Sequence, residues 1–309
     1  MRFSYWPAPT MPWPDLLEMS RHVEATGWDG IWYADHFMPN DEDTSAPWAE
    51  CWSTIAALAA AVPRVRLGPL VTGNTYRHPA VLAKMAATID HISGGRVVLG
   101  LGAGWQENEH LAYGIPFYTL GERLRRLDEA CRVIKALYGR QNASFVGNAY
   151  DLIDAPLEPK PVQDPLPLMI GGGGEKVTLR ITAQHADEWN VWGTVDILKH
   201  KMAVLDAHCE NVGRDPAEIQ RSAVALLFLS DNGSVLAKAR ARGAAMPSNI
   251  GGVAEITDAV GAYRDAGVHE FIVPAFNLGG KDRQKDVLDR FIEEVAPCVV
   301  DRTRENQRV

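Results

Sequence analysis

Short apolar runs recur along the 309-residue chain and alternate with longer segments of helical spacing. Eight such runs, rich in β-branched and aromatic residues, predict strands at residues 2–6, 30–34, 65–71, 96–102, 167–172, 188–192, 222–229 and 270–276. Nearly continuous apolar runs are typical of strands that are covered on both faces, as in a parallel sheet. Eight strands with helices between them predict an α/β fold, the (β/α)8 TIM barrel, with a doubly wound open sheet as the alternative.

Two of the intervening segments each carry one apolar stripe at helical spacing. The first predicts a helix over about 120–138, through Leu120, Leu124, Leu127, Cys131, Ile134 and Tyr138. Thr119 and Glu122 have the spacing of a capping box at its start. The second stripe runs from Val81 to Ile92, and we interpret Arg77-His78-Pro79 as the device that begins this helix.

The segments EATGWDGIWY and RDAGVHEFIV, near opposite ends of the chain, have almost the same layout. In each, a helical pattern ends, a glycine follows where a left-handed conformation is favoured, and a strand begins three or four residues later. The two glycines are Gly27 and Gly267. The repeated junction predicts one repeating architecture, so we expect a single barrel domain over residues 1–309.

Two segments exceed the repeat and are predicted to be insertions, at about 139–166 and 230–252. The first contains SFVGNAYDL, which predicts a hairpin with Gly147-Asn148 at its turn. Long insertions of this kind often form lids or interfaces.

Composition narrows the class of protein. The net charge of −8 comes from dispersed acids, which excludes the concentrated basic patch of a nucleic-acid-binding protein. The most apolar stretch, residues 55–62, is too short to cross a bilayer, and the first residues lack the apolar run of a signal peptide. The cysteines are widely spaced and the histidines form no metal-binding motif, so we expect a cytoplasmic protein with no metal and no disulfide framework.

Glycine-rich turns follow two neighbouring predicted strands. The segment LGLGAGWQENEH (99–110) lacks a dinucleotide fingerprint, because Trp105 stands where the third glycine belongs. The segment IGGGGEK (170–176) is the second turn. Because helix N-termini expose backbone N–H groups, two adjacent turns of this kind predict a cradle for a phosphate.

Other candidate site residues follow the ends of predicted strands, where a barrel carries its active site. Asp35 and His36 follow residues 30–34, and histidine exchanges a proton near neutral pH. A structural pair that caps a loop is the alternative for these two residues. Aromatic side chains at or beyond strand ends predict a pocket for a wide, flat ligand, lined by Trp48, Trp52, Trp105, Trp189 and Trp192.

Residues 67–117 resemble the bacterial luciferase-like superfamily, and in particular its branch that uses the deazaflavin coenzyme F420. The DHF segment at residues 35–37 and the segments 170–190 and 263–273 agree in order and spacing. The resemblance implies a (β/α)8 barrel, a homodimer, and a deazaflavin bound in the barrel mouth.

The same resemblance implies roles for individual residues. Asp35 would contact the coenzyme and His36 would lie at its reacting face. Leu70-Val71 would form a non-prolyl cis peptide in a bulge behind the ring, with Thr72 and Gly73 beside it. The coenzyme's phosphate tail would be held by Ala103, Gly104, Asn108, Gly171, Gly172, Gly173 and Gly174.

One departure bears on the substrate. Sugar-phosphate dehydrogenases of this superfamily have a glutamate where this chain has Trp105. We therefore expect a small neutral or aromatic organic molecule to exchange a hydride with F420. The alternatives are a monooxygenase that uses reduced FMN and oxygen, and a flavin-binding relative without catalytic activity.

Overall fold

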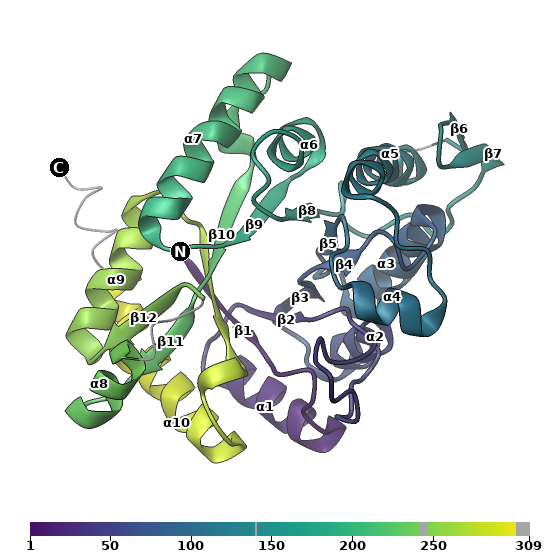
Figure 1. The fold of residues 1–309 in the computed structure, drawn as a ribbon. Coiled ribbons are helices and arrows are strands. Elements are labelled where there is room, and N and C mark those ends of the chain that lie inside the picture. Colours follow the sequence, from purple (N-terminus) through teal and green to yellow (C-terminus); the bar gives the residue numbers. More distant parts are fainter. Residues whose placement is uncertain (140, 242–245, 301–309) are drawn as a thin grey trace.

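The computed structural model describes residues 1–139, 141–241 and 246–300, and it contains a ring of parallel strands surrounded by helices (Figure 1). The strands of the ring are β1 (Arg2–Trp6), β2 (Gly30–Tyr33), β3 (Arg66–Pro69), β4 (Thr72–Gly73), β5 (Leu99–Gly102), β8 (Leu168–Gly171), β9 (Glu188–Trp192), β10 (Gln220–Val224) and β13 (Glu270–Pro274). The α-helices are α1 (Trp13–Ala25), α2 (Cys51–Ala61), α3 (Pro79–Ser93), α4 (Glu107–Tyr113), α5 (Leu120–Tyr138), α6 (Thr178–His185), α7 (Val195–Val212), α8 (Gly233–Ala241), α9 (Val253–Asp265) and α10 (Lys281–Arg290).

The ring closes through one interrupted strand. The strand order is β3-β2-β1-β13-β10-β9-β8-β5-β4, with parallel pairing throughout. β3 and β4 are two parts of one strand, separated by Leu70 and Val71. A parallel bridge between Leu67 and Val97 joins β3 to the chain just before β5, so the two ends of the order meet. The barrel prediction is confirmed and the open sheet is excluded.

Side chains alternate between the two faces of each barrel strand. The outward set packs against the helices in the larger hydrophobic cluster. The inward set fills the barrel as a separate cluster of Trp6, Trp32, Ala34, Leu70, Val98, Met169, Val224 and Ile272. The barrel is therefore a packed core that leaves ligand space only at its rim.

Charged side chains close the N-terminal end of the barrel. Glu270 is fully buried and accepts hydrogen bonds from Ser4 Oγ at 2.5 Å and Trp32 Nε1 at 2.8 Å. Its second oxygen pairs with Arg66 at 3.1 Å, and Arg66 also pairs with Glu188. Because each buried charge has a partner, the network seals this end without an unpaired ion.

The two repeated junctions are confirmed. Gly27 and Gly267 both have φ of +96°, which glycine adopts without steric cost. In both, the following N–H bonds back to a carbonyl five residues earlier at 3.0 Å, Trp28 to Val23 and Val268 to Tyr263. Each helix thus ends in the same way before its strand begins.

The predicted helices also form. α5 covers the predicted stripe, and the Thr119 side chain accepts from the Glu122 N–H at 3.3 Å. α3 begins at Pro79, and the His78 ring accepts from the Ala80 N–H at 3.2 Å. None of the helices that the structure describes is both long enough and apolar enough to span a membrane.

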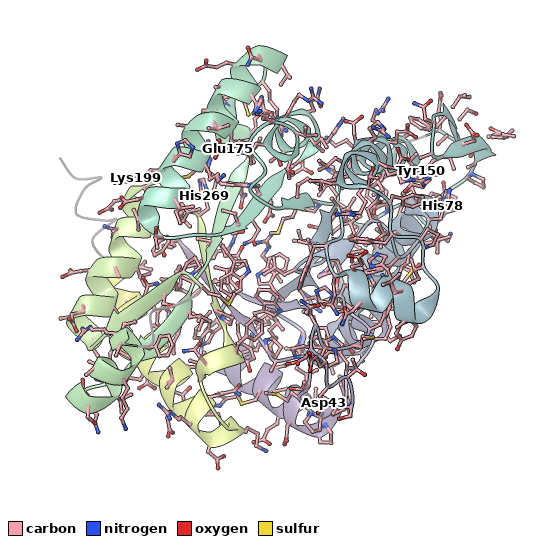
Figure 2. The ribbon with its side chains drawn as sticks, in the orientation of Figure 1. Asp43, His78, Tyr150, Glu175, Lys199 and His269 are labelled. Atoms are coloured by element: carbon pink, nitrogen blue, oxygen red, sulfur yellow. The ribbon has the colours of Figure 1, made fainter. Side chains whose placement is uncertain are left out.

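The first insertion forms the predicted hairpin, with antiparallel strands β6 (Ala143–Val146) and β7 (Asp151–Ala155). The hairpin lies beyond α5 at the edge of the molecule (Figure 1). The buried Glu129 of α5 accepts the N–H groups of Asn148 at 3.0 Å and Ala149 at 2.9 Å. Tyr150 lies against His78, with ring centroids 5.2 Å apart (Figure 2), and its hydroxyl accepts from Asn74 Nδ2 at 3.2 Å. The turn of the hairpin is thereby anchored to the barrel just after β4.

One predicted strand is divided in two. Residues 222–229 supply part of β10 but also β11 (Leu226–Leu229), which leaves the ring and pairs in parallel with β12 (Ser248–Gly251). The backbone of β11 forms its hydrogen bonds with β12. The sequence of β12 is too polar and too rich in glycine to predict a strand.

Candidate active site

The C-terminal end of the barrel gathers the predicted site residues around His36, which follows β2. His36 Nδ1 lies 2.7 Å from Glu109 Oε1 of α4. The Glu109 side chain is fully buried, whereas that of His36 is 18% exposed. The other ring nitrogen, Nε2, has no hydrogen-bond partner among the described residues, so it is the atom available to a ligand.

Glu109 accepts hydrogen bonds from two further groups besides His36. Its Oε2 accepts the Phe37 N–H at 2.7 Å, and its Oε1 also accepts the Tyr76 hydroxyl. Burial alone raises the pKa of the Glu109 carboxyl, but the hydrogen bonds from His36, Phe37 and Tyr76 outweigh it and hold the pKa below its ordinary value. Burial, and then the Glu109 carboxylate, raise the pKa of the Tyr76 phenol. Glu109 is therefore ionised, and Tyr76 stays a donor.

Polar side chains on and just before α4 clamp the loop that carries His36. Gln106 Nε2 donates to the Met38 carbonyl at 2.9 Å, and Asn108 Nδ2 donates to the Pro39 carbonyl at 3.0 Å. Asn108 Oδ1 accepts the Glu109 N–H at 2.9 Å. Asn108, predicted to bind the coenzyme tail, contacts this loop through Nδ2, while its Oδ1 is engaged within α4.

The Asp35 side chain is buried in an ion pair and is not exposed to a ligand. It is 1% exposed, and its two oxygens pair with Arg77 at 2.7 and 3.2 Å. Arg77 also pairs with Glu50 at 2.6 Å, which caps α2 by accepting the Trp52 and Ser53 N–H groups. Burial raises the pKa of the Asp35 carboxyl, and the Arg77 guanidinium counteracts that rise. The predicted contact between Asp35 and the coenzyme is replaced by an internal ion pair, and Arg77 does more than begin α3.

Aromatic rings surround the opening in two groups. Next to His36, the ring of Trp105 lies 5.4 Å away and that of Trp48 lies 6.5 Å away, both edge-on. The second group lies at other strand ends. There the ring centroid of Trp192 is 5.8 Å from that of Trp6 and 6.3 Å from that of Phe276. Trp48, Trp105 and Trp192 thus remain candidates for the pocket, and the sequence analysis missed Trp6 and Phe276.

Two of the predicted pocket tryptophans belong to the outer core instead. Trp189 is fully buried and donates to the Gly172 carbonyl at 2.8 Å. It is three residues from Trp192, so the two side chains leave β9 on opposite faces. Trp52 of α2 is 1% exposed and donates to Thr72 Oγ1 at 2.9 Å. Neither indole reaches the pocket, and their assignment to it is wrong.

The floor of the opening is built around Val71. The Leu70-Val71 peptide is cis, as predicted. A Cβ added at Gly100, Gly102 or Gly171 would lie 3.0, 2.8 or 2.7 Å from the Val71 side chain, so these positions admit only glycine. Thr72 and Gly73 are buried behind this floor, and Gly73 packs against the Tyr76 ring. The coenzyme contact of these two residues stays a prediction.

The two glycine-rich turns follow β5 and β8, which are paired neighbours. Gly104 has φ of +80° and Gly172 has φ of +127°, conformations that disfavour other residues. The Gly172 N–H donates a hydrogen bond to the Asn190 carbonyl at 3.0 Å, so it is not free to bind an anion. Ala103, Gly104, Gly171, Gly173 and Gly174 remain the candidates to contact an anion, and Gly172 contributes to this cradle through its backbone conformation rather than through its N–H.

Solved structures with a similar fold include enzymes with different activities. An F420-dependent secondary alcohol dehydrogenase, solved with an F420-acetone adduct, superposes with a TM-score of 0.82 at 21% identity, over 96% of this chain and 98% of that chain. The EDTA monooxygenase of Chelativorans sp. BNC1 superposes with a TM-score of 0.81 at 13% identity, over 98% of this chain and 94% of that chain. At these identities the likeness establishes the fold alone.

Sequence relatives and a family model narrow the assignment. An F420-dependent glucose-6-phosphate dehydrogenase of Amycolatopsis mediterranei (strain U-32) is 39% identical over 165 residues, which are 53% of this chain and 49% of the relative. The match thus spans about half the length of that relative. A model of the family described as luciferase-like monooxygenase matches residues 2–270. The chain therefore belongs to the luciferase-like monooxygenase family.

Proposed function

We propose that this protein is an F420-dependent oxidoreductase that moves a hydride between the deazaflavin and a small neutral or aromatic substrate. The observation that carries the proposal is the position of His36 at the barrel mouth, with Nδ1 engaged by Glu109 and the ring flanked by Trp48 and Trp105. A proton acceptor between aromatic walls suits an alcohol–carbonyl conversion. The F420-dependent relative supports the choice of coenzyme.

The residues at the mouth fit a bound deazaflavin. Trp6 Nε1, Trp48 Nε1 and Asn74 Oδ1 are among the buried polar atoms that have no partner among the described residues. Buried polar groups are rarely left unbonded, so these atoms suit the polar edge of a ring system. Val71 offers an apolar floor, and the turn at Gly104 packs closely against Thr75, where an added Cβ would lie only 2.7 Å from Oγ1.

Different side chains have different roles in the proposed reaction. The deazaflavin, when bound, accepts or donates the hydride. His36 Nε2 takes the proton from the substrate hydroxyl on oxidation and returns it on reduction. Trp48 and Trp105 orient the substrate and exclude water, which strengthens the electrostatic interactions inside the site.

The substrate class follows from the walls of the pocket. Trp105 is 61% exposed at the rim, beside His36. An indole at this position offers only apolar contact. The glutamate that sugar-phosphate dehydrogenases have there could instead form a hydrogen bond with a sugar hydroxyl. With Trp6, Trp192 and Phe276 packed together at other strand ends, the opening suits neutral aliphatic or aromatic alcohols and ketones. The cytoplasmic location and the homodimer stay predictions.

Titration of the purified protein with oxidised F420 and with FMN tests the choice of coenzyme. We expect F420 to bind at least about tenfold more tightly, a difference of about 1.4 kcal/mol. Bleaching of the visible F420 band with a panel of neutral alcohols, and glucose 6-phosphate as the charged comparison, then tests the substrate class. Tighter FMN binding, with oxygen consumption on reduction, would make the protein a flavin monooxygenase instead.

We predict that Gly104→Val weakens binding of F420 by at least about tenfold, because φ of +80° disfavours valine and its Cβ would clash with Thr75, so the turn must shift. Gly172→Val is expected to act in the same direction. The control is Gly213→Val, since Gly213 also has positive φ, +71°, but ends α7 in open space. Titration and thermal melting of the three variants separate binding from folding, and unchanged F420 affinity in both loop variants would exclude the cradle.

A further inference from the structure

We propose that Glu109 is a positioning residue that fixes the tautomer of His36, so that Nε2 is the nitrogen that exchanges the proton. The inference deepens the proposed function and rests on it for the role of Nε2. Glu109 lies 73 residues from His36 in sequence and does not itself face the opening, because its side chain is fully buried.

The Glu109 carboxylate is surrounded by hydrogen-bond donors. Three groups meet Glu109: His36 Nδ1 at 2.7 Å, the Phe37 N–H at 2.7 Å and the Tyr76 hydroxyl. The Phe37 amide can only donate, and Tyr76 is held as a phenol. An ionised carboxylate only accepts hydrogen bonds. His36 Nδ1 must therefore carry a hydrogen.

The location of that hydrogen determines what the other nitrogen does. In the neutral imidazole only one nitrogen is protonated, so Nε2 has a free lone pair directed away from Glu109. When the substrate hydroxyl is oxidised, its O–H bond breaks, the proton moves to Nε2, and the hydride leaves the adjacent carbon for the deazaflavin. The resulting imidazolium lies against the Glu109 carboxylate, which stabilises it. In the reverse reaction Nε2 returns the proton to the carbonyl oxygen.

A glutamine at this position is expected to reverse the tautomer. Its amide has one oxygen and one NH₂ group. The Phe37 N–H requires the oxygen, which leaves the NH₂ group directed at His36. Nδ1 would then accept a hydrogen bond and the hydrogen would move to Nε2, which can no longer take a proton from the substrate.

The tautomer can be measured directly on the coenzyme-free protein. Long-range ¹H–¹⁵N spectra of histidine-labelled protein, at about pH 8.5 where an ordinary histidine is neutral, distinguish protonated from unprotonated ring nitrogens. We expect protonated Nδ1 in the wild type and in Glu109→Asp, and protonated Nε2 in Glu109→Gln. A wild-type protein with protonated Nε2 would overturn the inference without any variant.

Kinetics with the loaded enzyme supply the second readout. Glu109→Gln is expected to lower kcat by about 100-fold or more, with KM within about threefold, as an amide does in other carboxylate–histidine pairs. Glu109→Asp is expected to recover most of kcat. Glu107→Gln is the matched control, because Glu107 is an exposed acid on the same helix.

The outcomes distinguish this inference from the proposed function. A reversed tautomer together with wild-type kcat would overturn the role of Glu109. Failure of the wild type to bind F420 would overturn the proposed function, while the tautomer measurement on the coenzyme-free protein would still decide what Glu109 does to His36.

Discussion

His36→Ala is expected to lower kcat by roughly 10²- to 10⁴-fold, the usual contribution of general acid–base catalysis. The alanine removes the only nitrogen in the Glu109–His36–Tyr76 cluster that is free to exchange a proton with a substrate. Affinity for F420 should change only a few-fold, because the glycine turns and the Val71 floor come from other strands.

Stopped-flow absorbance with F420 and a neutral substrate measures this effect. His78→Ala is the matched control, since His78 caps α3 and packs against Tyr150 of the hairpin rather than against Glu109 (Figure 2). Wild-type hydride transfer by His36→Ala across pH 6–8 would show that His36 does not carry the proton, and that its pairing with Glu109 only supports the loop.

Arg77→Met is expected to lower the free energy of unfolding by about 3–5 kcal/mol, the cost of removing one partner from a buried ion pair. Asp35 would then be left 1% exposed without its bidentate partner, and Glu50 would lose its contact as well. Because Asp35 is internal, the main effect of changing this pair should be on folding.

Urea unfolding of three proteins tests this expectation. The double variant Asp35→Leu with Arg77→Met should recover at least about 2 kcal/mol, because it leaves no unpaired charge. Arg64→Met is the control, since Arg64 is 68% exposed and its pair with Glu24 is worth at most about 1 kcal/mol. A loss below about 1 kcal/mol in Arg77→Met would mean that Asp35 finds another partner or a proton.

Most of the architecture follows from local patterns in the sequence. Each of the eight apolar runs contributes a strand to the barrel, and the stripe that begins at Leu120 becomes α5 with the predicted bounds. The error at residues 226–229 arose because β12 carries no strand pattern of its own. Strand pairing depends on the partner backbone as well as on side chains.

The site was harder to predict, because its main contacts join residues that are far apart in sequence. Arg77 and Asp35 are 42 residues apart, and Glu109 and His36 are 73 apart. No spacing rule within one helix or strand identifies such pairs. The error at Trp189 was avoidable, since alternation along β9 puts Trp189 and Trp192 on opposite faces.

The closed N-terminal end of the barrel has a consequence for how ligands enter and leave. Among the described residues, the network of Ser4, Arg66, Glu188 and Glu270 closes this end below the packed interior. If a coenzyme and a substrate react at the rim as proposed, both enter and leave at the C-terminal end of the barrel, so the ligand that binds deeper enters first and leaves last. The depth at which each ligand binds thereby fixes the order of its arrival and release.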